Sequence, residues 1–351
     1  DGQFVLFADD TNIFIVGADE EEAYSKANKV LSMIYLYMTS NQLHINMSKC
    51  AYIHFNPKNT NNSAARCRDI YNNFKPVLSI NGQKILPVKS TKFLGIIIDD
   101  KLCWDDQITY LENKLRGCLV AIKRIMTCIP KSQHIKIYNS LFLSHMTYGI
   151  NSWGGVPCYK LETLFAIQKR CVRLLFGEKK SFDHKEYYQT CARIKTYHEH
   201  TQPRNYCLEH TKPLFSKHKL LTLHCLYYKH MFVDTFKLLK YREPHGLYKN
   251  YKILNNPYKN KLQLSCKKES HEKFKYSFIA KSFYIWNKLY NSVLEKSIIS
   301  SKTGYVIPGE AKNSDLSASA ALIKNRVADV LLEFQSSGDN KGWETNQFNF
   351  C

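Results

Sequence analysis

Residues 4–16, Phe-Val-Leu-Phe-Ala-Asp-Asp-Thr-Asn-Ile-Phe-Ile-Val, decide how the first part of the chain folds. Two apolar runs flank a polar segment that begins with Asp9 and Asp10 and continues as a short turn, Thr11-Asn12, and this pattern predicts a β-hairpin. Hairpin tips favour Asn-Gly or Asp-Gly because they need a positive φ, but this tip has two carboxylates and no glycine. Neighbouring carboxylates repel each other, and a divalent cation relieves that repulsion. An ordinary solvated turn is the alternative, since turns often contain aspartate.

The composition describes a folded, basic chain. Its 351 residues are enough for two or three domains with hydrophobic cores, and a hydrophobic content of 44% excludes an intrinsically disordered polypeptide. The formal net charge of +20 predicts a polyanionic partner. Charge is also segregated, because residues 181–300 contain 22 Lys or Arg against 9 Asp or Glu, whereas residues 1–60 contain 4 against 7.

Three further features concern the setting of the protein. No apolar run reaches the roughly 18 residues of a membrane-spanning helix, and we expect no signal peptide. We therefore expect no membrane partner and an intracellular location, in the nucleus or the cytoplasm. The twelve cysteines are scattered without a Cys-x-x-Cys pair, which predicts reduced thiols. The first predicted strand has nothing before it to pair with, so we expect the C-terminal part of something longer, or a degenerate copy of it.

The rest of the first 100 residues predicts one helix and several strands. Asp19, with Glu22 three residues later, is a helix start, and the helix should end near Ser40. The further elements expected are a strand at 51–55, a hairpin around Asn81-Gly82 and a buried strand at 92–99.

From about residue 105 the apolar residues recur with a helical period. The first helix should begin at Asp105 or Asp106 and end before Pro130, and Ser132 is expected to cap a second helix. The apolar side of this second helix is expected to contain Ile135, Tyr138, Leu141, Phe142 and His145. A third helix should follow at about 161–175, so we predict a compact helical domain. One more helix is expected at Ser317–Phe334.

Three short motifs follow one another in the first 100 residues. Phe7-Ala8-Asp9-Asp10 is followed by Asn46-Met47-Ser48-Lys49 and then by Lys92-Phe93-Leu94-Gly95, with Asp99 and Trp104 behind it. This order resembles the second half of the palm of reverse transcriptases followed by the thumb. The string Phe-Ala-Asp-Asp-Thr resembles non-LTR retrotransposons, jockey-like elements in particular. The resemblance continues to about residue 300 in three segments, Ile167–Arg173, His210–Phe215 and Trp286–Leu289.

The resemblance implies an α+β fold. It implies a partial reverse-transcriptase palm of antiparallel hairpins plus a helix, followed by a mainly α-helical thumb and a basic helical post-thumb region. The expected parts are the C-terminal half of the palm (1–100), the thumb (101–180), the post-thumb region (181–300), and a C-terminal helix with a flexible tail (301–351).

The resemblance also implies the chemistry. Reverse transcriptases are RNA-directed DNA polymerases, which join deoxynucleoside triphosphates to a DNA primer on an RNA template by two-metal nucleotidyl transfer. Mg²⁺ prefers oxygen ligands, so Asp9 would be its main ligand and Asp10 a supporting one. Lys49 would stabilise charge near the leaving pyrophosphate, or donate a proton there. The alternative for Lys49 is a solvated lysine at the end of a strand.

Contacts with nucleic acid are expected in several places. Phe93, Leu94 and Gly95 would position the primer end, since glycine allows a backbone to approach closely; a core strand that contains a glycine is the alternative. Lys123 and Arg124 are also expected to contact nucleic acid. Beyond residue 181, basic residues interleaved with Tyr and Phe predict phosphate contacts and base stacking, or a helical domain with a solvated Lys-rich face.

The motifs present describe an incomplete polymerase. The family also needs a third carboxylate, on a palm strand before the hairpin, and fingers that bind the incoming nucleotide, so we expect this chain to be inactive alone. The alternatives are a retroelement-derived, non-catalytic RNA- or DNA-binding protein and an unrelated basic helical scaffold. A zinc site is disfavoured because no common zinc finger has the spacing of Cys191, His198, His200 and Cys207. His224 beside Cys225 is expected to pack rather than to catalyse.

Overall fold

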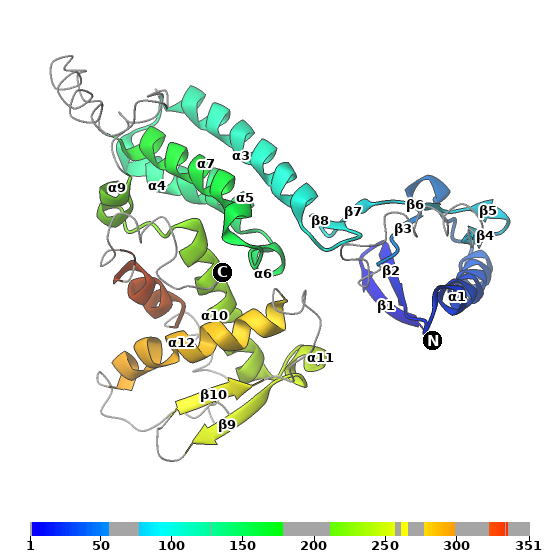
Figure 1. Ribbon diagram of the computed structural model, residues 1–351. Helices are drawn as coiled ribbons and strands as arrows, with labels where there is room; N and C mark the ends of the chain where they lie inside the picture. Colours follow the sequence, from blue (N-terminus) through cyan, green and yellow to red (C-terminus); the bar gives the residue numbers. More distant parts are fainter. Residues whose placement is uncertain are drawn as a thin grey trace, which may run out of the picture. The chain divides into compact units, whose positions relative to one another are not determined.

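The structure is a computed structural model that describes residues 2–55, 77–126, 128–177, 211–256, 261–265, 277–298, 323–333 and 335. The chain forms two compact units, Asp1–Asp106 and Gln107–Cys351 (Figure 1). Each combines helices with short hairpins, so the expected α+β class is correct. The division into palm, thumb and post-thumb regions stays a prediction. None of the helices in the described part of the chain combines the length and the hydrophobicity that a membrane span requires.

The first unit begins with the predicted hairpin. β1 (Gly2–Phe7) pairs antiparallel with β2 (Asp10–Ile15), and the last residue of β1 lies opposite the first residue of β2. The turn is therefore Ala8-Asp9, only two residues long. Thr11 and Asn12, which we expected in the turn, belong to β2 because the pairing of the two strands continues up to Asp10.

A helix and six short strands follow the hairpin. α1 (Glu20–Ser40) contacts β1, β2 and β4. The shorter elements are η1 (Met47–Lys49), β3 (Ala51–Tyr52), β4 (Ser79–Ile80), β5 (Gln83–Lys84), β6 (Leu86–Pro87), β7 (Ser90–Phe93) and β8 (Ile96–Asp99). β3 pairs with β6 in parallel, whereas β4–β5 and β7–β8 are antiparallel hairpins. The expected strand at 51–55 is thus only two residues long, and the single strand expected at 92–99 is wrong.

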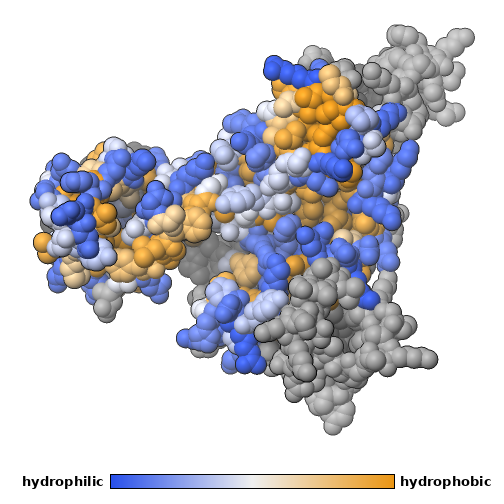
Figure 2. Space-filling view, turned by 180° about the vertical axis from the view of Figure 1, so that it is seen from behind, coloured by the Kyte–Doolittle hydropathy of each residue, from blue (hydrophilic) through white to orange (hydrophobic). Residues whose placement is uncertain are grey.

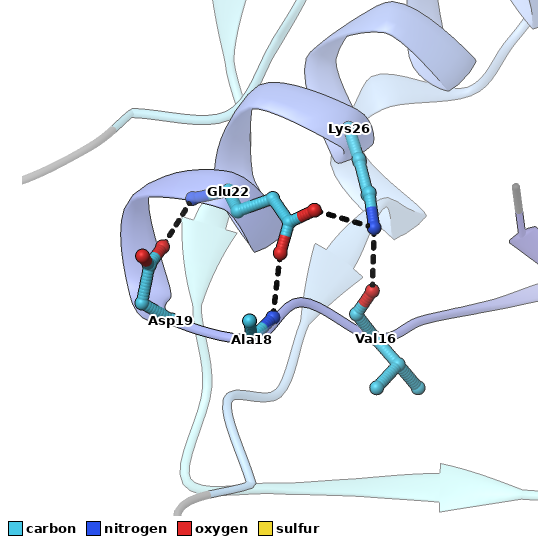
Figure 3. Close-up of polar contacts among 5 residues, drawn as sticks. All are labelled: Val16, Ala18, Asp19, Glu22 and Lys26. Carbon is cyan, nitrogen blue, oxygen red and sulfur yellow. Dashed lines mark hydrogen bonds and ion pairs between the residues drawn. The ribbon is translucent and has the colours of Figure 1, made fainter.

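The start of α1 has the hydrogen bonds that its sequence predicts (Figure 3). The Asp19 side chain accepts from the Glu22 backbone N–H at 2.8 Å, and the Glu22 carboxylate accepts from the Ala18 N–H at 2.6 Å. Lys26 pairs with Glu22 at 2.9 Å and donates to the Val16 carbonyl at 3.4 Å. These bonds satisfy N–H groups that have no partner within the helix, and they fix how the chain enters α1 from β2.

The core of the first unit is small. Its buried members are Ala27, Leu78, Ile80 and Ile85. Asn28 of α1 fixes the position of β4 beside this core, because its side-chain amide donates to the Val77 carbonyl at 3.1 Å and accepts from the Ser79 N–H at 3.1 Å. A helix side chain thus takes the place of a neighbouring strand.

The second unit is mainly helical. α3 (Asp105–Ile125) and α7 (Cys158–Phe176) lie where the sequence predicts a first and a third helix. The elements between them are η2 (Lys131–Gln133), α4 (His134–Ile137), the π-helical segment η3 (Tyr138–Leu143), α5 (Ser144–Thr147) and α6 (Ile150–Trp153). The elements after residue 210 are α9 (Lys212–Lys217), α10 (Leu223–Tyr241), α11 (His245–Tyr248), β9 (Lys252–Asn256), β10 (Lys261–Ser265), α12 (Phe278–Ile298) and a C-terminal helix at residues 323–333.

Residues 134–147 form one helix with a π-helical middle. Ser132 is not its cap, because it lies inside the preceding 3₁₀ turn. Leu141, expected on the apolar side, is 39% exposed. The buried side chains recur every four residues, at His134, Tyr138, Phe142 and Met146. Four α-helical residues overshoot a full turn by about 40°, and the wider π turn offsets this excess. The buried side chains therefore stay on one side.

Aromatic side chains fill the core of the second unit. Phe232 of α10 stacks on Trp286 of α12 with the ring centroids 4.9 Å apart, and both side chains are at most 1% exposed. α6 lies close to α10, since a Cβ atom on Gly154 would be 2.6 Å from the Tyr227 ring. This position therefore requires glycine.

The cysteines differ from the expectation at one position. The free cysteines in the described residues are Cys50, Cys103, Cys118, Cys128, Cys171 and Cys225. Cys158, the first residue of α7, is disulfide-bonded, so the prediction of reduced thiols is wrong there. Spacing in the sequence could not reveal this bond, because a disulfide depends on which Cα atoms the fold brings within about 7 Å.

Candidate functional site

The chain contains three adjacent aspartate pairs, 9–10, 99–100 and 105–106, and they occupy different settings. The Asp99 carboxylate accepts three backbone N–H groups from residues 101–104, at 3.1, 2.8 and 2.7 Å. The pair 105–106 opens α3, where the helix dipole favours acids. In the described residues no hydrogen bond or ion pair holds the exposed carboxylates of the pair 9–10. This pair is therefore the one available for a ligand.

The turn that carries the first pair has an unusual backbone. Ala8 has a φ of 51°, a conformation that suits glycine and costs an L-residue roughly 1–2 kcal/mol. Asp9 follows Ala8 in the turn, and Asp10 starts β2. A positive φ at the first residue of a two-residue hairpin turn matches the twist of the paired strands, so the tight turn between β1 and β2 explains the φ of Ala8.

The two aspartates do not by themselves form a metal centre. In the part of the chain that the structure describes, no group of three or more His, Cys, Asp or Glu side chains could hold a metal ion. A two-metal centre for nucleotidyl transfer needs several oxygen ligands in fixed geometry. The described residues thus supply a pair of carboxylates and lack the remaining ligands.

The hairpin behind the pair exposes apolar side chains. Phe4, Val5, Leu6 and Phe7 of β1 are 51%, 41%, 69% and 61% exposed. Because successive side chains of a strand point to opposite faces, both faces of β1 expose apolar side chains along this stretch. Figure 2 shows apolar residues reaching the surface of the first unit. Such surfaces are typical of interaction sites.

Lys49 is exposed at the end of the turn η1. Asn46 caps this turn, since its side-chain oxygen accepts from the Ser48 N–H at 3.1 Å and from the Ser48 hydroxyl at 2.6 Å. Asn46 of the Asn-x-x-Lys motif therefore stabilises the turn, and Lys49 is exposed at the end of the turn. The alternative of a solvated lysine stays open.

The motif expected to contact the primer forms a hairpin tip. Phe93 pairs with Ile96, and the two residues between them, Leu94 and Gly95, have φ angles of 45° and 86°. Positive φ at both central residues is the hairpin geometry that matches the twist of the strands, which explains why an apolar run that looks like one strand folds back here. All three motif residues from Phe93 to Gly95 are half-buried.

The basic residues expected to contact nucleic acid lie in the second unit. Lys123 and Arg124 are exposed in the last turn of α3, where cations are favoured by the helix dipole. The opposite side of α3 is buried through Ile108, Leu111, Leu115 and Ile122.

The predicted site residues therefore belong to separate elements of the chain. Asp9 is in the first hairpin turn and Asp10 is the next residue, at the start of β2, whereas Lys49 and the Phe93–Gly95 tip each belong to a turn of their own in the same unit. Lys123 and Arg124 are in the other unit. The expected roles of these residues in catalysis and binding stay predictions.

Sequence reasoning missed the partners of two buried polar residues. Gln168 of α7 is fully buried and bonds to the Tyr138 hydroxyl at 2.9 Å. Nδ1 of His134 lies 2.6 Å from the Leu175 carbonyl, and we assign it as the donor because a carbonyl can only accept. That carbonyl is in the last turn of α7, where the helix offers it no partner. Helical spacing places Gln168 on an apolar stripe but cannot name its partners.

Thiol and histidine chemistry is disfavoured inside the second unit. Burial raises the pKa of Cys171 to about 12 and the pKa of Cys225 to about 11, and a thiol must ionise to react. Burial also lowers the pKa of His224 to about 4. These shifts agree with packing of His224 and Cys225. The four zinc candidates between Cys191 and Cys207 lie outside the described residues.

Sequence comparison finds distant relatives of the chain among retrotransposon polymerases. Over 176 residues it is 23% identical to the RNA-directed DNA polymerase from mobile element jockey of Drosophila melanogaster, which covers 49% of this chain and 18% of that protein. The jockey polymerase of Drosophila funebris is 22% identical over 174 residues, with the same coverage. The Retrovirus-related Pol polyprotein from type-1 retrotransposable element R1 of Bradysia coprophila is 26% identical over 113 residues, 29% of this chain and 10% of that protein.

These matches confirm the resemblance to jockey-like non-LTR retrotransposon polymerases that the motifs predict. The chain spans less than a fifth of the length of the curated relatives it matches. No family model matches the chain, and no solved structure matches it either.

Proposed function

We propose that this chain is part of the RNA-directed DNA polymerase of a non-LTR retrotransposon and that its first unit supplies the paired carboxylates of the polymerase site. One observation carries the proposal. Of three adjacent aspartate pairs, the pair 9–10 sits on an exposed hairpin turn with no partner among the described residues. The chain that contains this pair is similar in sequence to the polymerases of jockey and R1 elements.

Each motif has a task in this proposal. Asp9 and Asp10 offer oxygen ligands for Mg²⁺, and Lys49 places a positive charge near the leaving pyrophosphate. The half-buried tip at Phe93–Gly95 positions the end of the DNA primer on its RNA template. Deoxynucleoside triphosphates are the substrates of the intact enzyme.

The chain alone is expected to bind nucleic acid without extending a primer. Two adjacent carboxylates cannot complete a two-metal centre, and the described residues offer no third one beside them. The exposed side chains of β1 support the same conclusion, because Leu6 and Phe7, on opposite faces of the strand, suit a surface that further polypeptide covers. A retroelement-derived protein that only binds RNA or DNA is the second candidate. It is favoured because the described residues do not supply a full set of metal ligands.

Two measurements on the 351-residue chain test the proposal. In a primer-extension assay with an RNA template, a DNA primer, deoxynucleoside triphosphates and Mg²⁺, we expect no product; extension would overturn the inactivity. Mn²⁺, used as a paramagnetic substitute for Mg²⁺, should broaden the NMR signals of the turn at Ala8-Asp9. The Asp9→Asn/Asp10→Asn variant should lose this broadening, whereas Asp100→Asn should keep it. Equal broadening in the two variants would show that Asp9 and Asp10 are not the metal ligands.

A further inference from the structure

The C-terminal helix at residues 323–333 runs antiparallel to α10. At one end Gln335 accepts from the Thr222 N–H at 3.1 Å and donates to the Leu220 carbonyl at 2.9 Å, just before α10 begins. At the other end Lys324 lies within electrostatic reach of Lys229 and His230 on α10. Val327 and Leu331 between these ends are fully buried. The packing of the two helices therefore places Lys324 near Lys229 and His230.

This packing gathers four basic side chains. His230 and Lys237 are seven residues apart on one side of α10, Lys229 precedes His230, and Lys324 comes from the C-terminal helix. The acid within this row, Asp234, is already engaged: it pairs with Lys237 at 3.3 Å and accepts from the Asn151 amide at 2.6 Å. Among the described residues, no carboxylate lies within 4 Å of the ammonium groups of Lys229 or Lys324.

The basic groups of this cluster repel one another. Partial burial lowers the pKa of Lys229, the charge of Lys324 lowers it further, and Asp329 opposes the shift. Partial burial also lowers the pKa of His230; Asp234 opposes this shift, whereas the lysines at 229, 324 and 237 add to it. A bound anion would relieve the repulsion.

The row continues into an exposed aromatic ring. Tyr241 is four residues beyond Lys237 on the same side of α10 and is 44% exposed. From Lys229 to Tyr241 the helix spans about 18 Å. Proteins that bind single-stranded nucleic acid combine cations that contact phosphates with exposed aromatic rings that stack on bases.

We propose that Lys229, His230 and Lys237 of α10, together with Lys324 of the C-terminal helix, form a binding surface for the phosphates of a single nucleic-acid strand, with Tyr241 as the platform for a base. This inference rests on the proposed function, because it says where the basic part of the polymerase holds nucleic acid.

The test is a binding titration of the whole chain with an unstructured, labelled RNA oligonucleotide at several salt concentrations. For Lys229→Gln/Lys324→Gln we expect about tenfold weaker binding at 0.1 M salt. The slope of log affinity against log salt should fall by about 1.4, roughly 0.7 for each lost phosphate contact on a single strand. The matched control, Lys136→Gln/Lys249→Gln, removes two exposed lysines elsewhere in the unit and should change both quantities much less.

The outcomes separate this inference from the proposed function. If the wild-type chain shows no salt-dependent RNA binding, both are wrong. If it binds RNA and the two double variants behave alike, the surface is wrong and the function stands. If the cluster variant loses binding to phosphatidylserine vesicles and keeps its RNA affinity, the partner is a membrane surface and the inference is overturned. RNA should also raise the pKa of His230 in an NMR titration, and an unchanged pKa would contradict contact with phosphate.

Discussion

Gln168 and Gln335 hold the same segment, residues 220–223 at the entry to α10, through bonds to alternate residues. Gln335 donates to the Leu220 carbonyl and accepts from the Thr222 N–H, at 2.9 and 3.1 Å. Gln168 donates to the Leu221 carbonyl and accepts from the Leu223 N–H, at 2.9 and 2.8 Å. Each carboxamide bonds to this segment as a neighbouring strand would. The segment thereby links α7 to the C-terminal helix at the start of α10.

In the described residues, two asparagine carboxamides bond to backbone groups in a related way. Asn28 of α1 bonds to Val77 and Ser79 beside β4. Asn287 of α12 accepts from the Leu264 N–H at 2.8 Å and donates to the Leu264 carbonyl at 2.9 Å. Short strands such as β4 and β10 leave backbone groups without partners in the sheet, and these side chains satisfy them.

Replacing Gln168 with leucine should destabilise the second unit. The change leaves the Leu221 carbonyl and the Leu223 N–H buried without partners, which costs about 2–5 kcal/mol. Urea unfolding followed by tryptophan fluorescence should show a lower midpoint. The control, Gln83→Leu, changes an exposed glutamine and should shift the midpoint little. Similar midpoints for the two variants would mean that these bonds contribute no net stability.

Replacing Ala8 with glycine should stabilise the first hairpin. The positive φ of Ala8 costs an alanine roughly 1 kcal/mol more than a glycine, while the greater freedom of glycine in the unfolded chain offsets part of this gain. We expect slower hydrogen exchange of the paired amides in β1 and β2. Ala23→Gly, in the interior of α1, should instead destabilise by about 1 kcal/mol. Faster exchange in Ala8→Gly would contradict the φ seen here.

Asp99 should be essential for the connection between β8 and α3. Its carboxylate holds three backbone N–H groups in a loop where Leu102 and Trp104 have positive φ. Asp99→Ala should therefore cost about 2–4 kcal/mol and speed hydrogen exchange of the Cys103 and Trp104 amides. Asp100→Ala removes the adjacent carboxylate and serves as the control. Equal hydrogen-exchange rates of these amides in the two variants would show that the Asp99 carboxylate does not hold the loop.

The start of α1 should loosen in acid. The hydrogen bond from the Ala18 N–H, followed by the contact with Lys26, lowers the pKa of Glu22 below its ordinary value. A carboxyl group with a lowered pKa stabilises the fold above its unfolded pKa, and this stabilisation is lost as the pH falls through the folded pKa. NMR of the Ala18 amide should show the bond breaking below pH 4.5. Glu22→Gln should remove most of this dependence and Glu21→Gln should not; a pH-independent Ala18 signal in the wild type would be contrary to the prediction.

Local patterns predicted the regular elements well. The Asp19–Glu22 start of α1, the apolar period of α3 and of α7, and the hairpin at Asn81-Gly82 were all readable in the sequence, because capping, periodicity and turn chemistry act over a few residues. The fold-back at Leu94-Gly95 was missed, because an apolar run with a single glycine does not distinguish one strand from two.

Residue order alone reveals the adjacent carboxylates after β1, the succession of the three motifs and the similarity to jockey-like polymerases. Which aspartate pair remains available for a ligand becomes clear from the fold. The Asp99 carboxylate is engaged by backbone N–H groups of the loop 101–104, whereas Asp9 and Asp10 are exposed beside the positive φ of Ala8. The fold also places Lys324 near Lys229, about 100 residues away in sequence. Hydrogen-bond partners and charge clusters depend on packing between distant segments, and local sequence patterns do not encode that packing.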